Sequence, residues 1–156
     1  SPTTATFTPR ITGNINSNTL DSTGNYKANF NIFNGFAKVI FRINDRFPLS
    51  FSGDYLYNVG TTQDNQAFQL GAKIGNTKDQ GNFFLGYNYK YLQADSTISL
   101  FVEDQLGSTD LQAQEGVFGV KLFPNTILSA TVQAKNGIKK FGQTNYTIRA
   151  NLVQSF

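Results

Sequence analysis

The chain is organised by a period-two alternation of large apolar side chains with small or polar ones. The stretch 82–92, "NFFLGYNYKYL", places its odd-numbered residues, all large apolar or aromatic, on one side and Phe84, Gly86, Asn88 and Lys90 on the other. The same alternation recurs in the stretches 49–58, 67–75, 116–123, 126–136 and 143–156. This period is typical of β-strands with two unlike faces, so the sequence predicts six regular strands.

Two N-terminal stretches are less regular. In Tyr26–Ile43 the apolar positions are even-numbered through Ile32 and odd-numbered from Ala37 onward. Either a two-residue hairpin turn at Asn34-Gly35 or a β-bulge in one long strand would explain this change of phase. An alternation of shorter and longer connections along the chain favours the bulge, and the choice stays open. A weaker strand over Ala5–Ile15 would bring the count to about eight.

We therefore predict an all-β fold, and the alternation alone fits a soluble sandwich or barrel as well as a membrane barrel. Charged residues make up 15% of the chain, against roughly 25% in typical soluble domains, and no apolar run is long enough for a transmembrane helix. The strands reach roughly 9 to 11 residues, which is the length that crosses a bilayer at a tilt. These features favour an antiparallel up-and-down transmembrane β-barrel. Residues 1–156 would form one barrel domain, or the C-terminal segment of a longer porin barrel.

The aromatic residues are sorted by strand end. The ends next to the shorter connections hold Phe41, Phe51, Phe83, Phe123 and Phe156. The ends next to the longer connections hold Tyr26, Tyr57, Tyr89, Tyr91 and Tyr146. Aromatic belts at both lipid–water interfaces are typical of membrane barrels, so we expect the apolar stripe to face lipid.

The opposite face of the predicted strands is strongly basic. Its inward cations are Lys38, Arg42, Lys73, Lys90, Lys121, Lys135 and Arg149. Asp54 is the main inward acid, so these charges cannot neutralise one another. Because buried unpaired charges are costly, this face needs water or anions, unless several of the long side chains reach solvent at the rims. We predict that it lines a pore wider than eight strands alone enclose.

Several motifs together resemble the C-terminal part of a family of bacterial porins. They are "FNGFAKVIFRI", "FPLSFSGDYLYN", "LGAKIGNTKDQGNFFLGYNYKYLQADS" and the final Phe. The resemblance covers the chain from about residue 25 onward, and it implies an outer-membrane barrel with more strands than this segment supplies. It also implies a Gram-negative-type bacterium and contact with outer-membrane lipid.

The end of the chain resembles the signal that the outer-membrane barrel-assembly machinery recognises. This signal would consist of Ile148, Ala150, Leu152 and Phe156 on one face of the last strand. Gln154 departs from the pattern, which prefers an apolar residue there.

The absence of His and Cys argues against nucleophilic catalysis and the usual metal sites, so we expect no enzyme, cofactor or metal. Nucleic-acid binding is not expected, because aromatic and basic residues lie on opposite strand faces. The connection near residues 93–111 holds an apolar patch, Ile98, Leu100, Phe101 and Val102, which would constrict the lumen or dock elsewhere.

The predicted function is passive diffusion of small hydrophilic solutes through an outer-membrane pore with weak anion preference. Homo-oligomers or N-terminal strands outside this sequence would complete the barrel. One alternative is a small closed outer-membrane barrel with a structural or partner-binding role through its external loops. A second alternative is a soluble β-barrel or sandwich that binds a partner.

Overall fold

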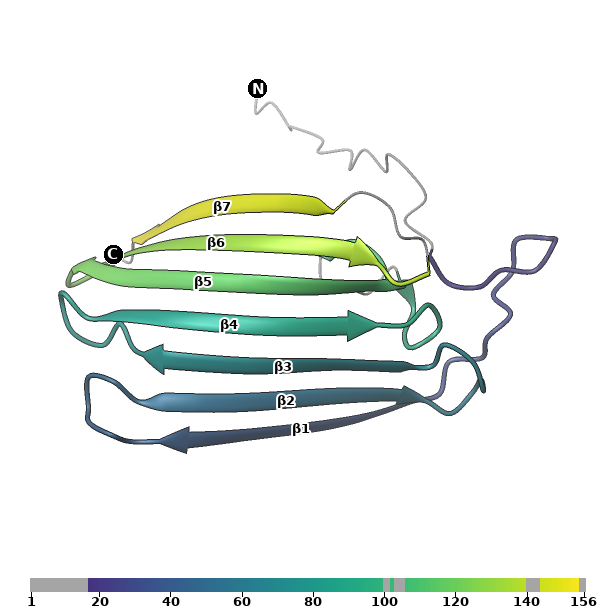
Figure 1. Cartoon of the computed structure of the whole chain (residues 1–156), viewed down its shortest axis with the longest axis horizontal. Helices are drawn as coiled ribbons and strands as arrows, with labels where there is room; N and C mark the ends of the chain where they lie inside the picture. Colours follow the sequence, from purple (N-terminus) through teal and green to yellow (C-terminus); the bar gives the residue numbers. More distant parts are fainter. Residues whose placement is uncertain (1–16, 100–101, 103–105, 140–143, 155–156) are drawn as a thin grey trace, which may run out of the picture.

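The computed structural model describes residues 17–99, 102, 106–139 and 144–154, and it contains seven β-strands (Figure 1). The strands are β1 (Ile32–Phe41), β2 (Leu49–Asn58), β3 (Gln66–Gly75), β4 (Phe83–Leu92), β5 (Leu111–Phe123), β6 (Thr126–Gly137) and β7 (Asn145–Gln154). They form one antiparallel sheet in the order of the sequence, β1-β2-β3-β4-β5-β6-β7. The predicted all-β, up-and-down architecture and its six regular strands are confirmed. The weak strand predicted over Ala5–Ile15 lies outside the described residues.

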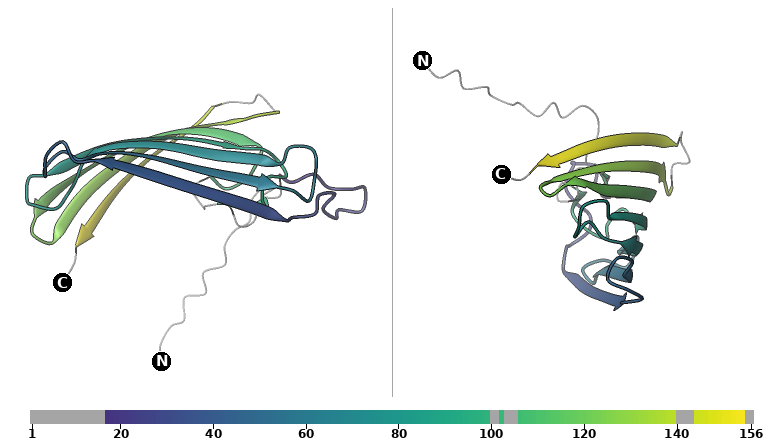
Figure 2. Two further views of the ribbon diagram at one scale, coloured as in Figure 1. Left: turned by 90° about the horizontal axis from the view of Figure 1, so that it is seen from below. Right: turned by 90° about the vertical axis from the view of Figure 1, so that its left-hand side faces the viewer.

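The sheet is open over the residues that the structure describes. Figure 2 shows it arched and twisted, with β1 and β7 at its two free edges. Each strand pairs only with its neighbours in the sequence, and no pairing joins β7 to β1. The described part of the chain is therefore a curved sheet and not a closed barrel.

The strands are long. Five strands have 10 residues, β6 has 12 and β5 has 13. At about 3.4 Å per residue, ten residues span about 34 Å, well above the typical length in soluble sheets. One register shift occurs in the described sheet, between Lys121 and Phe123 beside the tight turn at Pro124 and Asn125.

β1 differs from the predicted bulge or hairpin. Its pairing with β2 runs without a register shift from Ile32↔Asn58 to Phe41↔Leu49, so Asn34-Gly35 is neither a turn nor a bulge. The apparent change of phase has another cause. The strand begins at Ile32, and most of the even-numbered apolar residues before it lie in the preceding loop. Phe36 and Ile40 then share the face of Asp54 and Ser50, their pairing partners, so β1 has apolar residues on both faces.

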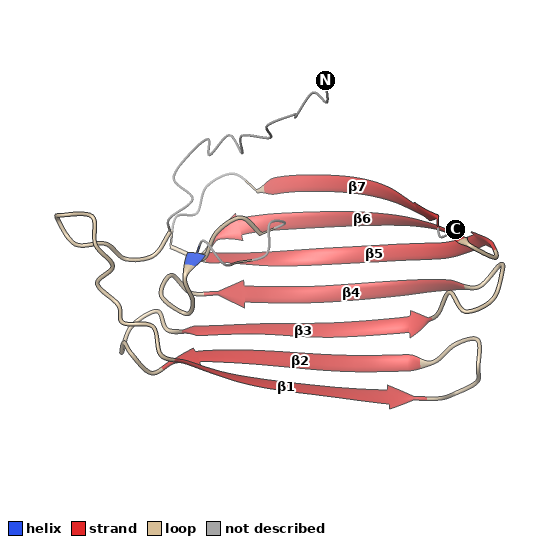
Figure 3. Ribbon diagram, turned by 180° about the vertical axis from the view of Figure 1, so that it is seen from behind, coloured by secondary structure: helices blue, strands red, loops and turns tan. Residues whose placement is uncertain are grey.

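Connection lengths alternate less than the sequence suggested. The connections 42–48, 59–65, 76–82 and 138–144 have equal lengths, whereas 124–125 is a tight turn and 93–110 is long. The only helical turn seen in the described chain lies at Ser99 within this long connection (Figure 3). None of the helical structure in these residues is long and apolar enough to cross a membrane.

The only sizeable buried apolar cluster in the described residues lies between the sheet and the 93–110 connection. It consists of Ala67, Leu92, Leu106, Leu111 and Ala113, with Leu56 and Val102 packed against it. The described residues supply no second layer over the rest of the sheet, and its apolar side chains are exposed among them.

Candidate functional site

Every charged residue of the seven strands lies on one face of the sheet, which we call the polar face. The pairing registers place Lys38, Ser52, Gly71, Asn88, Glu115, Gln133 and Thr147 in one row across all seven strands. The next row contains Phe36, Asp54, Gln69, Lys90, Ala113, Lys135 and Asn145. The row on the other side contains Ile40, Ser50, Lys73, Gly86, Val117, Thr131 and Arg149.

The opposite face, the apolar face, holds no charged residue in any strand. One of its rows reads Val39, Phe51, Ala72, Tyr87, Gly116, Val132 and Ile148. Large side chains on it are exposed, for example Leu70 at 55% and Ile148 at 77%. The predicted division of the six regular strands into a charged, polar face and an apolar face is therefore confirmed. An apolar surface of this extent on a water-soluble monomer would be exceptional.

Aromatic contacts on the apolar face divide between the two ends of the sheet. Phe41 packs edge-on against Phe51, and Phe83 contacts both Phe47 and Phe118, all near the 42–48, 76–82 and 124–125 connections. At the other end Tyr55 stacks on Tyr57, and Phe68 contacts Tyr89 and Tyr91.

The predicted sorting of Phe from Tyr holds in part, since Phe33 and Phe68 lie at the tyrosine end. The hydroxyls of Tyr87 and Tyr89 donate to Gln114 and Gln112 on β5, at 3.3 and 3.0 Å. Two tyrosine hydroxyls of β4 are thus paired with neighbouring amide oxygens of β5.

The predicted pore-lining cations occupy four environments, one of which is the hollow that holds Lys38 and Lys73. Arg42 follows the end of β1, and the Lys121 ammonium donates to the Lys78 carbonyl at 2.8 Å, so both lie at the end with the tight turn. Lys90 is 4% exposed, and the Lys135 ammonium donates to the Leu106 carbonyl at 3.2 Å beneath the long connection. Arg149 lies on the polar face of the edge strand β7.

Lys38 and Lys73 line a hollow of about 210 Å³ with Ser50, Ser52 and Asn88. The Lys73 ammonium lies 4.0 Å from the ring centroid of Phe84. That ring covers Gly119, where an added Cβ would lie 2.3 Å from a ring carbon. Glycine at position 119 therefore makes room for the aromatic partner of Lys73.

Glu115 is a polar-face residue that the sequence analysis missed. Its carboxylate accepts from Asn88 at 2.9 Å and Gln133 at 3.3 Å, and it lies 4.0 Å from the Lys90 ammonium. The Lys90 and Glu115 side chains are only 5% and 8% exposed. Glu115 shares the face of Lys121, but the strand predicted from the sequence began at Gly116, whereas β5 begins at Leu111. Asp54, predicted as the main acid of this face, therefore shares it with a second carboxylate, Glu115.

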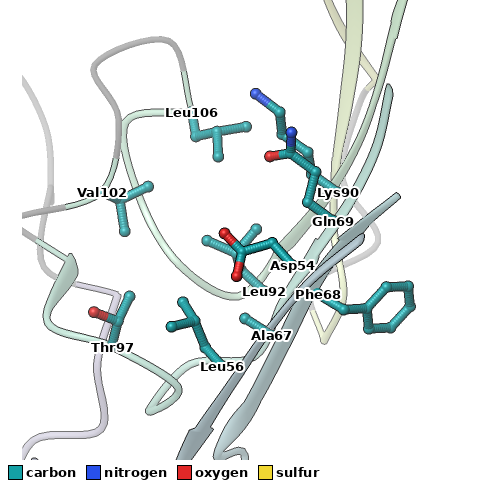
Figure 4. A pocket seen from close by; sticks show the side chains of 10 residues that line it. All are labelled: Asp54, Leu56, Ala67, Phe68, Gln69, Lys90, Leu92, Thr97, Val102 and Leu106. Carbon is teal, nitrogen blue, oxygen red and sulfur yellow. The ribbon is translucent and has the colours of Figure 1, made fainter. Parts of the chain in front are cut away.

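Asp54 lies on the polar face as predicted. Its carboxylate accepts a hydrogen bond from the Asn34 side chain at 2.5 Å. It lines a second hollow of about 220 Å³ between the sheet and the long connection, together with Gln69, Lys90 and Leu106 (Figure 4).

The long connection is tied to the sheet by buried polar side chains. Asn58, fully buried at the end of β2, donates to the carbonyls of Asn29 and Asp95 and accepts from the amides of Asn31 and Gly60. Asn18 joins the same network. Its amide donates to the carbonyls of Ala94 and Thr97 at 2.6 and 2.7 Å, and its oxygen accepts from the Ser99 amide.

Of the four residues predicted to constrict the lumen, Val102 packs against the apolar cluster on the polar face. Ile98 is half-buried in the same connection, and Leu100 and Phe101 lie outside the described residues. The connection thus covers one end of the polar face. In the predicted assembly signal, Ile148, Ala150 and Leu152 share the apolar face of β7, while Phe156 lies outside the described residues.

The charged groups of the described chain do not form a metal site, since no group of three or more Asp or Glu residues gathers there. Comparisons with protein-family models, with curated proteins and with solved structures found no match to this chain.

Proposed function

We propose that this chain is part of an outer-membrane β-barrel whose polar face lines a water-filled pore. The observation that carries this proposal is the placement of all the charged strand residues on one face and of uncharged, largely apolar residues on the other. A soluble sheet with this pattern would need a second layer over its apolar face. The described chain supplies no such layer, and its large apolar residues stay exposed. Hydrocarbon is the environment that suits them.

Lipid placement also fits the dimensions of the sheet. Ten-residue strands at a tilt match the hydrocarbon thickness, and the Phe and Tyr contacts lie at opposite ends, where the two interfaces would be. A charge on this face would cost roughly 2 to 4 kcal/mol at the bilayer midplane, which gives a physical reason for its exclusion.

Closure requires more strands than the seven described. The free edges of β1 and β7 carry backbone groups that hydrocarbon cannot satisfy, so they must pair before the sheet can span a bilayer. N-terminal strands of a longer chain or a second copy would supply the partners. A barrel widened in this way has room for water beside the polar face.

The charge of the polar face favours anions weakly. Its strands carry Lys38, Lys73, Lys90, Lys121, Lys135 and Arg149 against Asp54 and Glu115. Because Lys90 lies beside Glu115, the effective excess is smaller than the sequence suggested. A wall with this modest positive excess raises the local concentration of anions and lowers that of cations.

The decisive experiment is conductance of the full-length protein in planar lipid bilayers under a salt gradient. We expect channels whose reversal potential shows mild anion selectivity. Cation selectivity, or no channels from protein whose folded state is verified by heat-modifiable gel migration, would contradict the proposed pore.

Single-cysteine labelling tests the facing of each strand independently. Cysteines at Lys73 and Lys121 should react with a water-soluble maleimide in intact vesicles, whereas cysteines at Leu70 and Leu128 should be shielded by acyl chains. Shielding of Lys73 would show that the assigned facing of β3 is inverted.

A further inference from the structure

Two lysines line one hollow on the polar face. Its volume is about 210 Å³, and every residue that lines it lies in strands β1 to β5. Lys38 comes from β1 and Lys73 from β3, and both side chains are exposed. No Asp or Glu of the described chain contributes to the lining. The sheet alone therefore forms this hollow, and its charge is positive.

Small residues keep the hollow open. Ser52 pairs with Gly71 and Gly71 pairs with Asn88 in one row, while Lys73 pairs with Gly86 in the next. A Cβ added at Gly71 would lie 2.7 Å from the Ser52 hydroxyl oxygen and 2.7 Å from the Asn88 Oδ1. Glycine at position 71 therefore leaves the space between these two polar oxygens free for another molecule.

The two ammonium groups can reach the same point in this space. Lys38 lies in the row of Gly71, two strands away, and Lys73 lies two residues further along β3. With strands about 4.8 Å apart and a rise of about 3.4 Å per residue, the backbones of the two lysines are roughly 12 Å apart. Each ammonium is carried on a flexible four-carbon stem, so both can contact one ligand that lies between them.

Neither ammonium pairs with a carboxylate of the residues that the structure describes. Asp54 and Glu115, the two acids of the strands, accept hydrogen bonds from other side chains. The Lys73 ammonium lies 4.0 Å from the Phe84 ring centroid. This contact holds the ammonium beside the hollow, and because an ammonium has three donors, it can still donate to an anion.

The polar groups of the hollow suit an anion that both accepts and donates hydrogen bonds. The two ammonium groups and the Ser52 hydroxyl are donors. Asn88 offers an acceptor, since its Nδ2 donates to Glu115 at 2.9 Å and its Oδ1 lies beside Gly71. Hydrogen phosphate, HPO₄²⁻, carries two negative charges, charged acceptor oxygens and one hydroxyl. Sulfate and phosphate monoesters have the same charge but no such hydroxyl on the central atom.

We propose that this hollow binds inorganic hydrogen phosphate. Lys38 and Lys73 donate to its charged oxygens, the Ser52 hydroxyl donates to one of them, and the phosphate hydroxyl donates to Asn88 Oδ1. Charge-assisted hydrogen bonds of this kind are the strong ones. The inference rests on the proposed function, because the anion reaches the hollow only if the polar face is in contact with water. It adds the identity of an anion that the pore wall would select.

The test is isothermal titration of the full-length protein in nonionic detergent micelles at pH 8 with sodium phosphate. We expect saturable binding at one site per chain. Sulfate and methyl phosphate should each bind at least about tenfold more weakly, because neither can donate to Asn88. Chloride, which carries a single charge, should bind more weakly than either. The methyl phosphate arm also separates inorganic phosphate from the phosphate group of a larger solute.

Substitution of the two lysines tests the location of the site. Lys38→Gln and Lys73→Gln should each weaken phosphate binding about tenfold. The matched control is Lys78→Gln, which removes one positive charge from an exposed position outside the hollow. Phosphate affinity should be unchanged in this variant.

Three outcomes would overturn the inference: no saturable heat with phosphate, sulfate or methyl phosphate binding as tightly as phosphate, or an equal loss of affinity in Lys78→Gln and Lys73→Gln. If a lysine variant fails to fold, the anion series on the natural protein decides the question. The proposed pore is tested separately. Protein that conducts ions but does not bind phosphate contradicts the phosphate site alone, and protein that forms no channels contradicts the pore whether or not phosphate binds.

Discussion

Lys139 forms an ion pair with Asp64, although the two residues lie in connections that flank β6 and β3. In a flat sheet, β3 and β6 would be about 14 Å apart. Both connections also bind the long loop, through hydrogen bonds from the Asp95 amide to the Asp64 carbonyl and from the Ile138 amide to the Asp110 carbonyl. The connections at this end of the sheet are therefore drawn together by polar contacts.

The Lys139 pair predicts a dependence of stability on alkaline pH. The hydrogen bond to the Asp64 carboxylate raises the pKa of Lys139. A raised lysine pKa stabilises the fold fully below the ordinary lysine pKa, roughly 10.4, and this contribution is lost as pH rises through the raised value. Because the Lys139 side chain is 54% exposed, we expect Lys139→Gln to cost less than about 1 kcal/mol at pH 8. Urea unfolding measured at pH 8 and above pH 11 gives the fall in the free energy of unfolding between the two conditions. This fall should be smaller in Lys139→Gln than in the natural protein. In the control Lys27→Gln, at an exposed lysine, the fall should be as large as in the natural protein.

The two faces of β6 provide a matched test of lipid contact. Ser129 lies on the polar face and Ala130, the next residue, on the apolar face between Phe118 and Ala150. We expect Ala130→Arg to lower the free energy of unfolding in lipid vesicles by about 2 kcal/mol, because the guanidinium would enter hydrocarbon. Ser129→Arg should cost much less, since its side chain would reach water. Equal losses in the two variants would rule out hydrocarbon on the apolar face of this strand.

Removal of the Glu115 charge should destabilise the polar face and change selectivity. Glu115→Gln keeps the shape of the side chain but leaves the buried Lys90 ammonium without its neighbouring carboxylate. We expect a loss of up to about 3 kcal/mol in urea unfolding, because a buried ammonium loses a neighbouring carboxylate. The reversal potential should move toward stronger anion selectivity. The double variant Lys90→Met/Glu115→Gln should recover part of the stability, and no recovery would show that the two charges do not act as a pair.

Gly119 should tolerate no side chain while Phe84 covers it. Gly119→Ala places a Cβ 2.3 Å from the Phe84 ring, so the ring must move away from the Lys73 ammonium. We expect a loss of about 1 to 3 kcal/mol, the usual range for overpacking. Gly116→Ala on the same strand is the control, since nothing lies within 4 Å of its added Cβ. In the double variant Gly119→Ala/Phe84→Leu a smaller side chain replaces the ring, and stability should be restored. If the double variant is as unstable as Gly119→Ala, the clash with Phe84 is not the cause of the loss.

The period-two alternation predicted most of the fold because each regular strand has one uncharged, largely apolar face. Strands β2 to β7 and their facing follow directly from it. The alternation is misleading where a strand lacks such a face. β1 is an edge strand with apolar residues on both faces, so its alternation appeared to change phase. There the pairing with β2 decides the local structure, and it overrides the turn propensity of Asn34-Gly35.

The sequence predicted which charged residues lie on the polar face, but it did not predict which of them contact one another. The cations of the polar face and Asp54 could be assigned to one side of the sheet from the alternation alone. The pairing of Lys90 with Glu115 depends on the register between β4 and β5, which no property of either strand alone determines. The hollow beside Asp54 depends on how the 93–110 connection folds back onto the sheet. That fold-back is fixed by Asn18 and Asn58, polar residues far from it in the sequence.

The turn at Pro124 and Asn125 also bears on the order in which the sheet assembles. Closing a short loop costs less chain entropy than closing a long one, so the β5–β6 hairpin should form first, and the β4–β5 pairing across 93–110 should form late. Pulse-labelled amide exchange during refolding would reveal this order as early protection of β6. Until that late step, the backbone groups of β5 that later pair with β4 are free to pair with other chains. Intermolecular aggregation should therefore compete most strongly with folding during this interval.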